Sequence, residues 1–141
     1  MNIKYDPQQK SPDVFKRFII PLNSKKDSEK VIRRIKDIKK DSTIYVNQRS
    51  QRALGQALNV AICIAEAAYV APRIVLLAGG PCTVGVGTVI SPDLKEKMRS
   101  PRELMNGENV KYFGSSKKYY DSLCKKVISK KIIIDLFAFS L

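Results

Sequence analysis

Apolar residues follow two different periods along this chain, and the change between them predicts alternating helices and strands. In residues 24–39 they recur every three or four positions, which predicts an amphipathic helix with Ser24 as its N-cap. We expect this helix to cover one face of a sheet. The polar residues 41–52 predict a loop, and residues 52–69, apolar almost all round the helical wheel, predict a second helix buried on more than one side.

Two aliphatic runs predict strands. Residues 74–78 and 132–141 are apolar on both faces, as is typical of parallel strands inside a sheet. Between them the sequence allows a short strand at 88–90, then a polar, proline-broken connection over 91–107 and a third helix over 108–130. A strand, a crossover helix and a second strand form a right-handed βαβ unit, so the two strands are expected to lie parallel in one sheet.

These elements are too few for a complete domain. Two strands that are apolar on both faces need further strands and a second helical layer to bury them. The chain also stops inside or just after its last predicted strand. We therefore expect an α/β fold that is present here as a partial domain of a larger protein.

Composition adds a strong positive charge to this picture. The 141 residues are 44% hydrophobic, which suits one globular domain or part of one, and they carry a net charge of +13. The excess lies on both sides of a neutral central segment, residues 53–92. Such a surface attracts phospholipid headgroups, nucleic acid or acidic protein patches, but it is also compatible with an ordinary solvated, lysine-rich surface.

The cysteines and the apolar runs indicate the cellular compartment. Cys63, Cys82 and Cys124 are far apart and show no Cys-x-x-Cys spacing, so neither a disulfide framework nor a zinc site is predicted. We expect them to be reduced thiols in the cytosol. The polar first ten residues do not form a signal peptide, and the longest uncharged apolar run, 53–65, is too short to cross a bilayer, so a soluble chain is expected.

The most distinctive segment is the glycine loop that follows the first strand, residues 79–87. In open α/β sheets such a loop often binds a ligand. Neither nucleotide fingerprint fits, because Gly87 is followed by Thr88 and Val89 where a P-loop has lysine, and Ile90 stands where the dinucleotide motif has glycine. We interpret the glycines as residues that permit positive φ angles and close backbone packing.

No catalytic residue can be assigned. The chain contains no histidine, which excludes Ser-His-Asp and Cys-His mechanisms. No paired carboxylates lie near the strand ends for acid–base chemistry. Cys82 has no base beside it in the sequence and is interpreted as a small packing residue.

Several segments together carry a resemblance to a known family. They are Arg17-Phe-Ile-Ile-Pro-Leu22, Gly55-x-Ala57-Leu58, Gly79-Gly80-Pro81-x-Thr83-x-Gly85-x-Gly87, Asp93-Leu-Lys with Arg99-Ser100, Lys111-Tyr112 with Tyr120, and Ile134-Asp135-Leu-Phe-Ala138. Over roughly residues 14–141 they resemble the trunk domain of the GTPase-activating inner-coat subunit of the COPII vesicle coat. The glycine string is the most specific part of the resemblance.

The resemblance implies a von Willebrand A-like fold, a Rossmann-like open sheet with flanking helices. Residues 14–141 would be the central-to-late part of that domain, and residues 1–13 a flexible N-terminal segment. Many such domains bind a divalent cation through an Asp-x-Ser-x-Ser motif, a threonine and an aspartate. At the two positions that can be inspected, 52–55 and 78–80, this sequence has no side-chain oxygen, so no metal site is expected.

The resemblance also implies a scaffold role in endoplasmic reticulum to Golgi transport, on the cytoplasmic side and peripheral to the membrane. The implied partners are the COPII cargo-adaptor subunit, the Sar-type small GTPase, the outer-coat subunit and the anionic membrane. The family's zinc and arginine finger would lie elsewhere, so this segment is expected to hold no cofactor and no catalytic residue. The arginines here are interpreted as surface or structural residues. The candidate partner or membrane contacts are Arg99, Arg102, Lys117 and Lys118.

Two alternatives remain from the residues themselves. One is a nucleotide-dependent α/β enzyme that uses the 79–87 loop in an unfamiliar geometry. The other is a basic nucleic-acid-binding module. Against the second, four aromatic residues fall at helical spacing and are expected to make core or helix–helix contacts rather than stack on bases; they are Tyr112, Phe113, Tyr119 and Tyr120.

Overall fold

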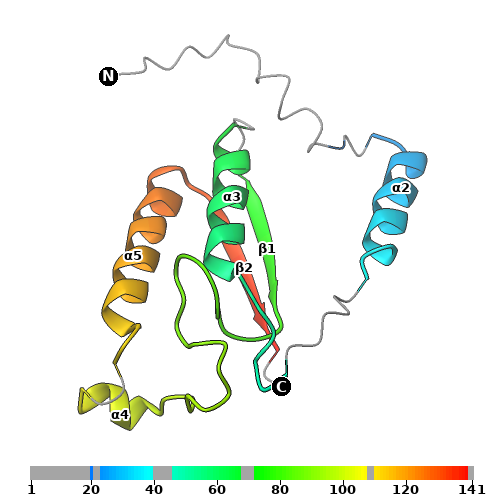
Figure 1. The fold of residues 1–141 in the computed structure, drawn as a ribbon. Helices are drawn as coiled ribbons and strands as arrows, with labels where there is room; N and C mark the ends of the chain where they lie inside the picture. The colour runs from blue at the N-terminus through cyan, green and yellow to red at the C-terminus, as the bar shows by residue number, and fades with distance from the viewer. Residues whose placement is uncertain (1–19, 21–22, 40–45, 68–71, 108–109, 140–141) are drawn as a thin grey trace. The chain divides into compact units, whose positions relative to one another are not determined.

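The computed structural model describes residues 20, 23–39, 46–67, 72–107 and 110–139. It divides the chain into two units, Met1–Thr43 and Ile44–Leu141, which we describe separately (Figure 1). The first contains α2 (Lys25–Lys36). The second contains, in chain order, α3 (Leu54–Ala67), β1 (Arg73–Ala78), α4 (Pro101–Met105), α5 (Phe113–Ser129) and β2 (Ile133–Ala138).

Helix α2 begins where the sequence predicts and ends three residues earlier. Ser24 is the N-cap: its backbone is extended, and its side-chain oxygen accepts a hydrogen bond from the backbone N–H of Asp27 at 3.3 Å. Ile32 and Ile35 lie on the predicted apolar stripe and are 51% and 61% exposed. That this stripe covers a sheet remains a prediction. The predicted N-terminal segment, 1–13, lies outside the described residues.

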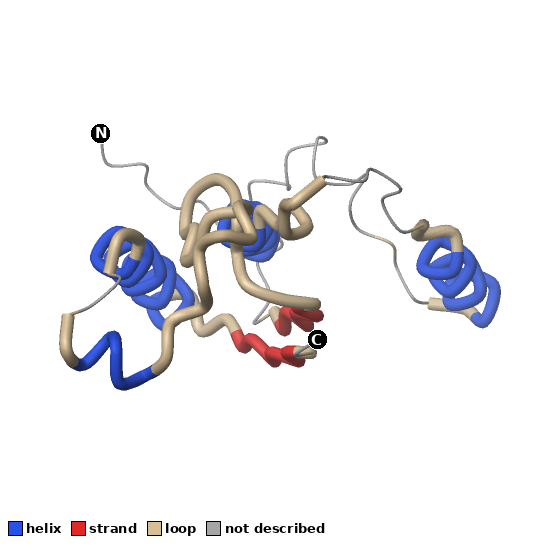
Figure 2. The backbone as a smooth tube through the Cα atoms, turned by 60° about the horizontal axis from the view of Figure 1, so that its bottom comes forward, coloured by secondary structure: helices blue, strands red, loops and turns tan. Residues whose placement is uncertain are grey.

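The second unit is built on the predicted βαβ arrangement. Strands β1 and β2 pair in parallel, in a register that runs from Arg73 opposite Ile133 to Ala78 opposite Ala138. Helix α3 lies over one face of this sheet with α5 beside it, as Figures 1 and 2 both show. The structure therefore confirms a mixed α/β segment with a small parallel sheet.

The core lies between the sheet and these two helices. It is centred on the fully buried Ile62 of α3, Leu123 of α5 and Ile132 just before β2, with Ile74 and Ile134 packed against them from the strands. Aliphatic side chains at these positions leave water on folding, which is the main favourable contribution to the stability of the unit.

Only one side of α3 is buried, so the expectation of burial on more than one side is wrong within the described part of the chain. Ile62 is completely inaccessible, whereas Val60 is 48% exposed. The reason is that the sheet and α5 both lie against the same side of the helix, and no described element covers the opposite side. The helix also spans Leu54–Ala67 rather than 52–69.

The second face of the sheet is open among the described residues. Val75 and Leu77 of β1 and Phe137 of β2 point to that face and are 60%, 66% and 52% exposed. The same face carries an ion pair between Arg73 and Asp135, with two hydrogen bonds, one of them 3.0 Å from Nη2 to Oδ1. The hydrogen bond from Arg73 lowers the pKa of Asp135 below its usual value.

Two local expectations are corrected. Residues 88–90 do not form a short strand, because the N–H of Val89 bonds the carbonyl of Cys82 at 3.0 Å and closes the loop on itself. The 91–107 segment, predicted as a polar, proline-broken connection, contains helix α4. Ser100 and Glu103 form a capping box there, a four-residue signal that was readable in the sequence.

The last predicted helix and strand are shorter than expected. Helix α5 begins at Phe113 rather than at residue 108, and it ends at Ser129. Its buried residues are Ser116 and Leu123, whereas the neighbouring Cys124 is exposed. Strand β2 ends at Ala138, and the final two residues of the predicted strand lie outside the described residues.

Replacing Leu123 with alanine should cost about 2 to 5 kcal/mol of unfolding free energy, because it opens a cavity at the centre of the core. Urea denaturation followed by circular dichroism would measure this. Ile128→Ala is the matched control on the same helix, since Ile128 is 70% exposed and should change the stability by less than about 0.5 kcal/mol. Equal losses in the two variants would contradict this assignment of the core.

Candidate functional site

The glycine loop leaves the end of β1 and runs between α3 and α5 (Figure 1). Its position depends on Thr83, which is 1% exposed. The Thr83 hydroxyl accepts a hydrogen bond from the N–H of Arg52 and donates one to the carbonyl of Ser50, both at 2.9 Å. In return, the carbonyl of Arg52 accepts from the N–H groups of Thr83 and Val84 at 3.0 and 3.3 Å. These bonds join the loop to the segment that leads into α3.

Three of the four loop glycines have positive φ angles, as the pattern predicts. The angles are 152° at Gly80, 76° at Gly85 and 78° at Gly87. At Gly87 the space is also closed, because a Cβ atom built there would lie 2.9 Å from the ring atoms of Tyr119 and the hydroxyl of Tyr120. Gly79 has neither constraint, since it is exposed and a Cβ there would meet nothing within 4 Å. Pro81 is half-buried.

The closest approach of the loop is to the first turn of α3. A Cβ atom at Gly55 would lie only 2.2 Å from the carbonyl oxygen of Val86, so no other residue fits without moving the backbone. The tip of the loop therefore rests directly on the main chain of the helix. This contact explains in physical terms why the first turn of α3 has a glycine at position 55.

Two tyrosines of α5 fasten the loop from the other side. The hydroxyl of Tyr119 donates to the carbonyl of Gly55 and that of Tyr120 to the carbonyl of Gly87, each at 3.0 Å. Their rings meet edge to face, with centroids 5.5 Å apart. Burial raises the pKa of Tyr120 to about 12, with a smaller contribution from the nearby Cys82. The helical spacing predicted buried aromatics, but it did not show that their hydroxyls bind loop carbonyls.

The hydroxyl groups around the loop already donate to the protein itself. Thr88 donates to the carbonyl of Gly85 at 2.6 Å, and Ser115 donates to that of Tyr112 at 3.0 Å. Thr83 and the two tyrosines donate inward as described above. A phosphate site needs donors that face the ligand. This arrangement therefore counts against the loop as a nucleotide-binding site.

Nothing in the described residues supplies a metal site in the loop region. No group of three or more cysteine, aspartate, glutamate or histidine side chains comes together anywhere in that part of the chain. Cys82 is buried at 2% exposure, with its sulfur 3.5 Å from the carbonyl oxygen of Val84 and 3.8 Å from that of Val86. It packs under the loop, whereas Cys63 and Cys124 are exposed.

Arg49 anchors the connection that follows the loop, a role that sequence reasoning did not assign. Its guanidinium donates to the backbone carbonyls of Ser91 at 3.2 Å, of Asp93, and of Glu96 at 2.5 Å. Its own N–H bonds the carbonyl of Pro92 at 2.6 Å. A planar group with five donors suits such a set of carbonyls. No sequence signal distinguishes this arginine from the others, because its partners lie more than 40 positions away.

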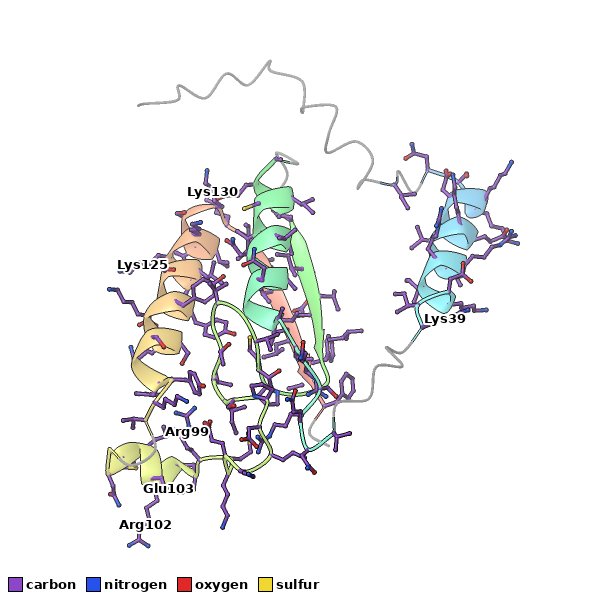
Figure 3. The ribbon with its side chains drawn as sticks, viewed as in Figure 1. Lys39, Arg99, Arg102, Glu103, Lys125 and Lys130 are labelled. Atoms are coloured by element: carbon purple, nitrogen blue, oxygen red, sulfur yellow. The ribbon has the colours of Figure 1, made fainter. Side chains whose placement is uncertain are left out.

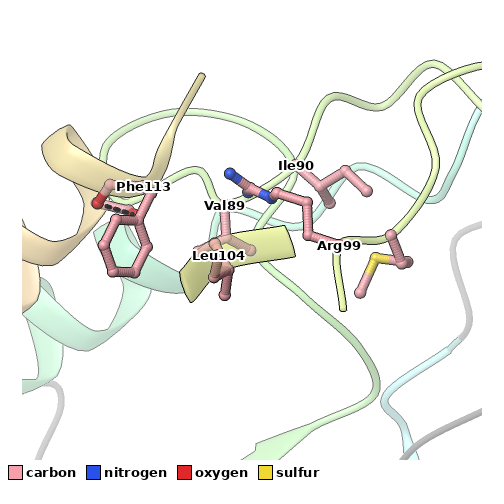
Figure 4. A pocket seen from close by; sticks show the side chains of 7 residues that line it. Val89, Ile90, Arg99, Leu104 and Phe113 are labelled. Carbon is pink, nitrogen blue, oxygen red and sulfur yellow. Dashed lines mark hydrogen bonds between the residues drawn. The ribbon is translucent and has the colours of Figure 1, made fainter. Parts of the chain in front are cut away.

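The candidate contact residues fall in two places. Arg99 and Arg102 lie at α4, where Arg102 is exposed and Arg99 is half-buried (Figure 3). Arg99 lines a pocket of about 220 Å³ together with apolar residues that include Val89, Ile90, Leu104 and Phe113 (Figure 4). Lys117 and Lys118 are exposed on α5, and Lys117 is paired with Asp121 one turn away, at 2.8 Å.

Residues 8–141 match the family model of the Sec23/Sec24 trunk domain. The chain belongs to this family. The protein transport protein SEC23 F of Arabidopsis thaliana is 39% identical to it over 100 residues, which make up 70% of this chain and 13% of that protein. The resemblance carried by the glycine string is thus confirmed at the level of the family, and this Sec23/Sec24 trunk segment spans a small part of the length of its curated relative.

Replacing Gly87 with alanine should destabilise this trunk segment more than the same change at Gly85 or Gly79. Gly85→Ala should cost about 1 kcal/mol for the left-handed backbone alone, since the space around it is open. Gly87→Ala adds a clash with two rings, and Gly79→Ala should be nearly neutral. Thermal unfolding of the three variants would check this order, and an effect of Gly79→Ala as large as that of Gly87→Ala would refute it.

Tyr120→Phe should remove the bond to Gly87 and cost about 1 kcal/mol at neutral pH. Because the folded-state pKa of Tyr120 is raised to about 12, folding favours the protonated hydroxyl. Its contribution is therefore complete below the unfolded pKa of about 10 and is lost as the pH rises through 12. Urea unfolding at a series of pH values should show a smaller alkaline loss of stability in Tyr120→Phe than in the parent. Identical alkaline profiles would disprove this linkage.

Proposed function

We propose that this chain is part of the trunk of the COPII inner-coat subunit that activates the Sar-type small GTPase, and that it acts as an assembly scaffold in endoplasmic reticulum to Golgi transport. The family match over residues 8–141 is the observation that carries the proposal. The name of the Arabidopsis relative, a protein transport protein, agrees with it.

Within that protein the segment would be the central-to-late part of a von Willebrand A-like domain, covering residues 14–141. Strands β1 and β2 would be neighbours in a larger open sheet. The open face of the present sheet supports this, because Val75, Leu77 and Phe137 leave an apolar surface that a further layer would bury.

The glycine loop would have a structural role. Thr83 and the two tyrosine hydroxyls fix its course, because each of the three hydroxyls donates to a protein carbonyl. In this proposal the segment supplies no catalytic arginine, no metal ligand and no cofactor site. The arginine finger and the zinc of the subunit would lie in other parts of it.

The proposed partners are the cargo-adaptor subunit, the Sar-type GTPase, the outer-coat subunit and an anionic membrane surface, approached from the cytoplasmic side. No helix in the described ranges has both the length and the apolarity to cross a bilayer. The net charge of +13 and the exposed Arg102 and Lys118 support a peripheral, electrostatic contact. Nucleic acid is not proposed as a partner, because the Tyr119 and Tyr120 rings pack against each other and the glycine loop rather than forming a stacking platform.

Neutralising two exposed cations, Arg102→Gln with Lys118→Gln, should weaken binding to phosphatidylserine-containing vesicles about thirtyfold, since each basic residue contributes about 1 kcal/mol near an anionic surface. Flotation of the purified chain would measure this. The matched control is Lys117→Gln with Asp121→Asn, which removes an ion pair without changing the net charge. Binding that ignores both anionic lipid content and salt would count against the electrostatic contact.

A further inference from the structure

We propose that Ser100 is a phosphorylation site, the acceptor for a serine kinase that recognises arginine before the serine and proline after it. The sequence there is Arg99-Ser100-Pro101-Arg102. Ser100 and Arg102 are exposed, and the segment lies on the connection between the glycine loop and α5 (Figure 3). Neither the scaffold role nor the glycine loop accounts for this arrangement.

The local backbone already has the form that a kinase requires. Ser100 has φ −81° and ψ 158°, an extended conformation that the following proline favours. A kinase binds its substrate as an extended strand, so the acceptor residue needs little rearrangement. The helix that follows, α4, has only five residues and none of them is buried, so it can open at small cost.

A second Ser-Pro sequence in the described residues provides an internal comparison. Ser91 precedes Pro92, but its side chain is half-buried and its hydroxyl accepts a hydrogen bond from the N–H of Asp93 at 3.1 Å. Its carbonyl is held by Arg49 at 3.2 Å. Two positions after Ser91 the chain has Asp93, whereas two positions after Ser100 it has Arg102. Ser91 is therefore both less accessible and differently flanked than Ser100.

The reaction is an ordinary phosphoryl transfer with ATP as the donor. The Ser100 Oγ attacks the γ-phosphorus, and a new P–O bond forms as the bond from that phosphorus to the β,γ-bridging oxygen breaks. ADP leaves with the electron pair of that bond. The hydroxyl proton passes to a carboxylate of the kinase, so the chain gains a phosphoserine and nothing is oxidised or reduced.

Phosphorylation would open the capping box. At present the Ser100 hydroxyl accepts from the N–H of Glu103 at 3.2 Å, and the Glu103 carboxylate accepts from the N–H of Ser100 at 2.6 Å. A phosphate carries a charge of about −2 at neutral pH, and beside Glu103 it meets a like charge. The summed formal charge of Ser100 and its neighbours Arg99, Arg102 and Glu103 would therefore change from positive to negative.

Opening the capping box would also alter the lining of the pocket shown in Figure 4. Arg99 and Leu104 both line this pocket, and they lie directly before and after the capping-box residues Ser100 and Glu103. The effect of phosphorylation on membrane binding rests on the proposed function, in which the surface around Arg102 meets an anionic bilayer. A phosphate there would repel the same surface that the arginines attract.

The test uses the purified chain, ATP and a purified kinase that selects Arg-Ser-Pro sequences, with phosphopeptides quantified by mass spectrometry. We expect at least about ten times more phosphate on Ser100 than on Ser91, consistent with more than about 1.4 kcal/mol of discrimination in kcat/KM. Ser100→Asn should abolish the signal while keeping a capping oxygen, and Pro101→Ala should reduce it. An unmodified Ser100, or equal labelling of Ser91, would overturn the proposal.

The second measurement compares phosphorylated and unmodified chain in flotation with phosphatidylserine-containing vesicles. We expect about thirtyfold weaker binding after phosphorylation, because the modification offsets two positive charges that contribute about 1 kcal/mol each. Equal binding of the two forms would overturn the claim that the changed charge around Ser100 weakens membrane binding. A chain that gains phosphate on Ser100 but floats in neither form would support the acceptor site and refute the membrane contact of the proposed function.

Discussion

The tip of the glycine loop touches the main chain of α3 with no side chain between them, and the rest of the second unit is arranged around that contact. Gly55 leaves room for the carbonyl of Val86, and the Tyr119 hydroxyl bonds the carbonyl of the same glycine. One residue of α3 thus meets the loop and α5 at once. The two helices are thereby held side by side, and together they pack against Ile74 and Ile134 on the inner face of the sheet.

The same contact determines what the loop can do. Loops at the carboxyl ends of parallel strands bind ligands when their N–H and hydroxyl groups point outward. Here the Thr83 hydroxyl, the tyrosine hydroxyls and the N–H of Val89 are bonded to protein carbonyls. These four groups therefore stabilise the loop itself.

Local patterns in the sequence predicted local features well. Ser24 as a cap, the extent of β1 and the positive φ of Gly87 all follow from residues within a few positions of one another. The parallel pairing joins residues 60 positions apart, and it was predicted from the general rule for strand–helix–strand connections. The contacts of Arg49 and Tyr119 could not be predicted from local patterns, since their partners are 42 to 64 positions distant. The burial of α3 was overestimated because a helical wheel shows which residues are apolar, but not which layers a segment supplies. Helix α4 was missed although its capping box was visible.

The open face of the sheet explains why a charged pair can sit among apolar residues. Arg73 and Asp135 hold each other with two hydrogen bonds, and the arginine lowers the pKa of the aspartate. A lone carboxylate beside Val75 would oppose any layer that covered this face, because an unpaired buried charge is costly. In a bidentate pair the arginine compensates the carboxylate, so covering the two groups together costs far less desolvation free energy than covering the carboxylate alone. On the exposed face each of these two charges thus has an opposite charge as its direct partner.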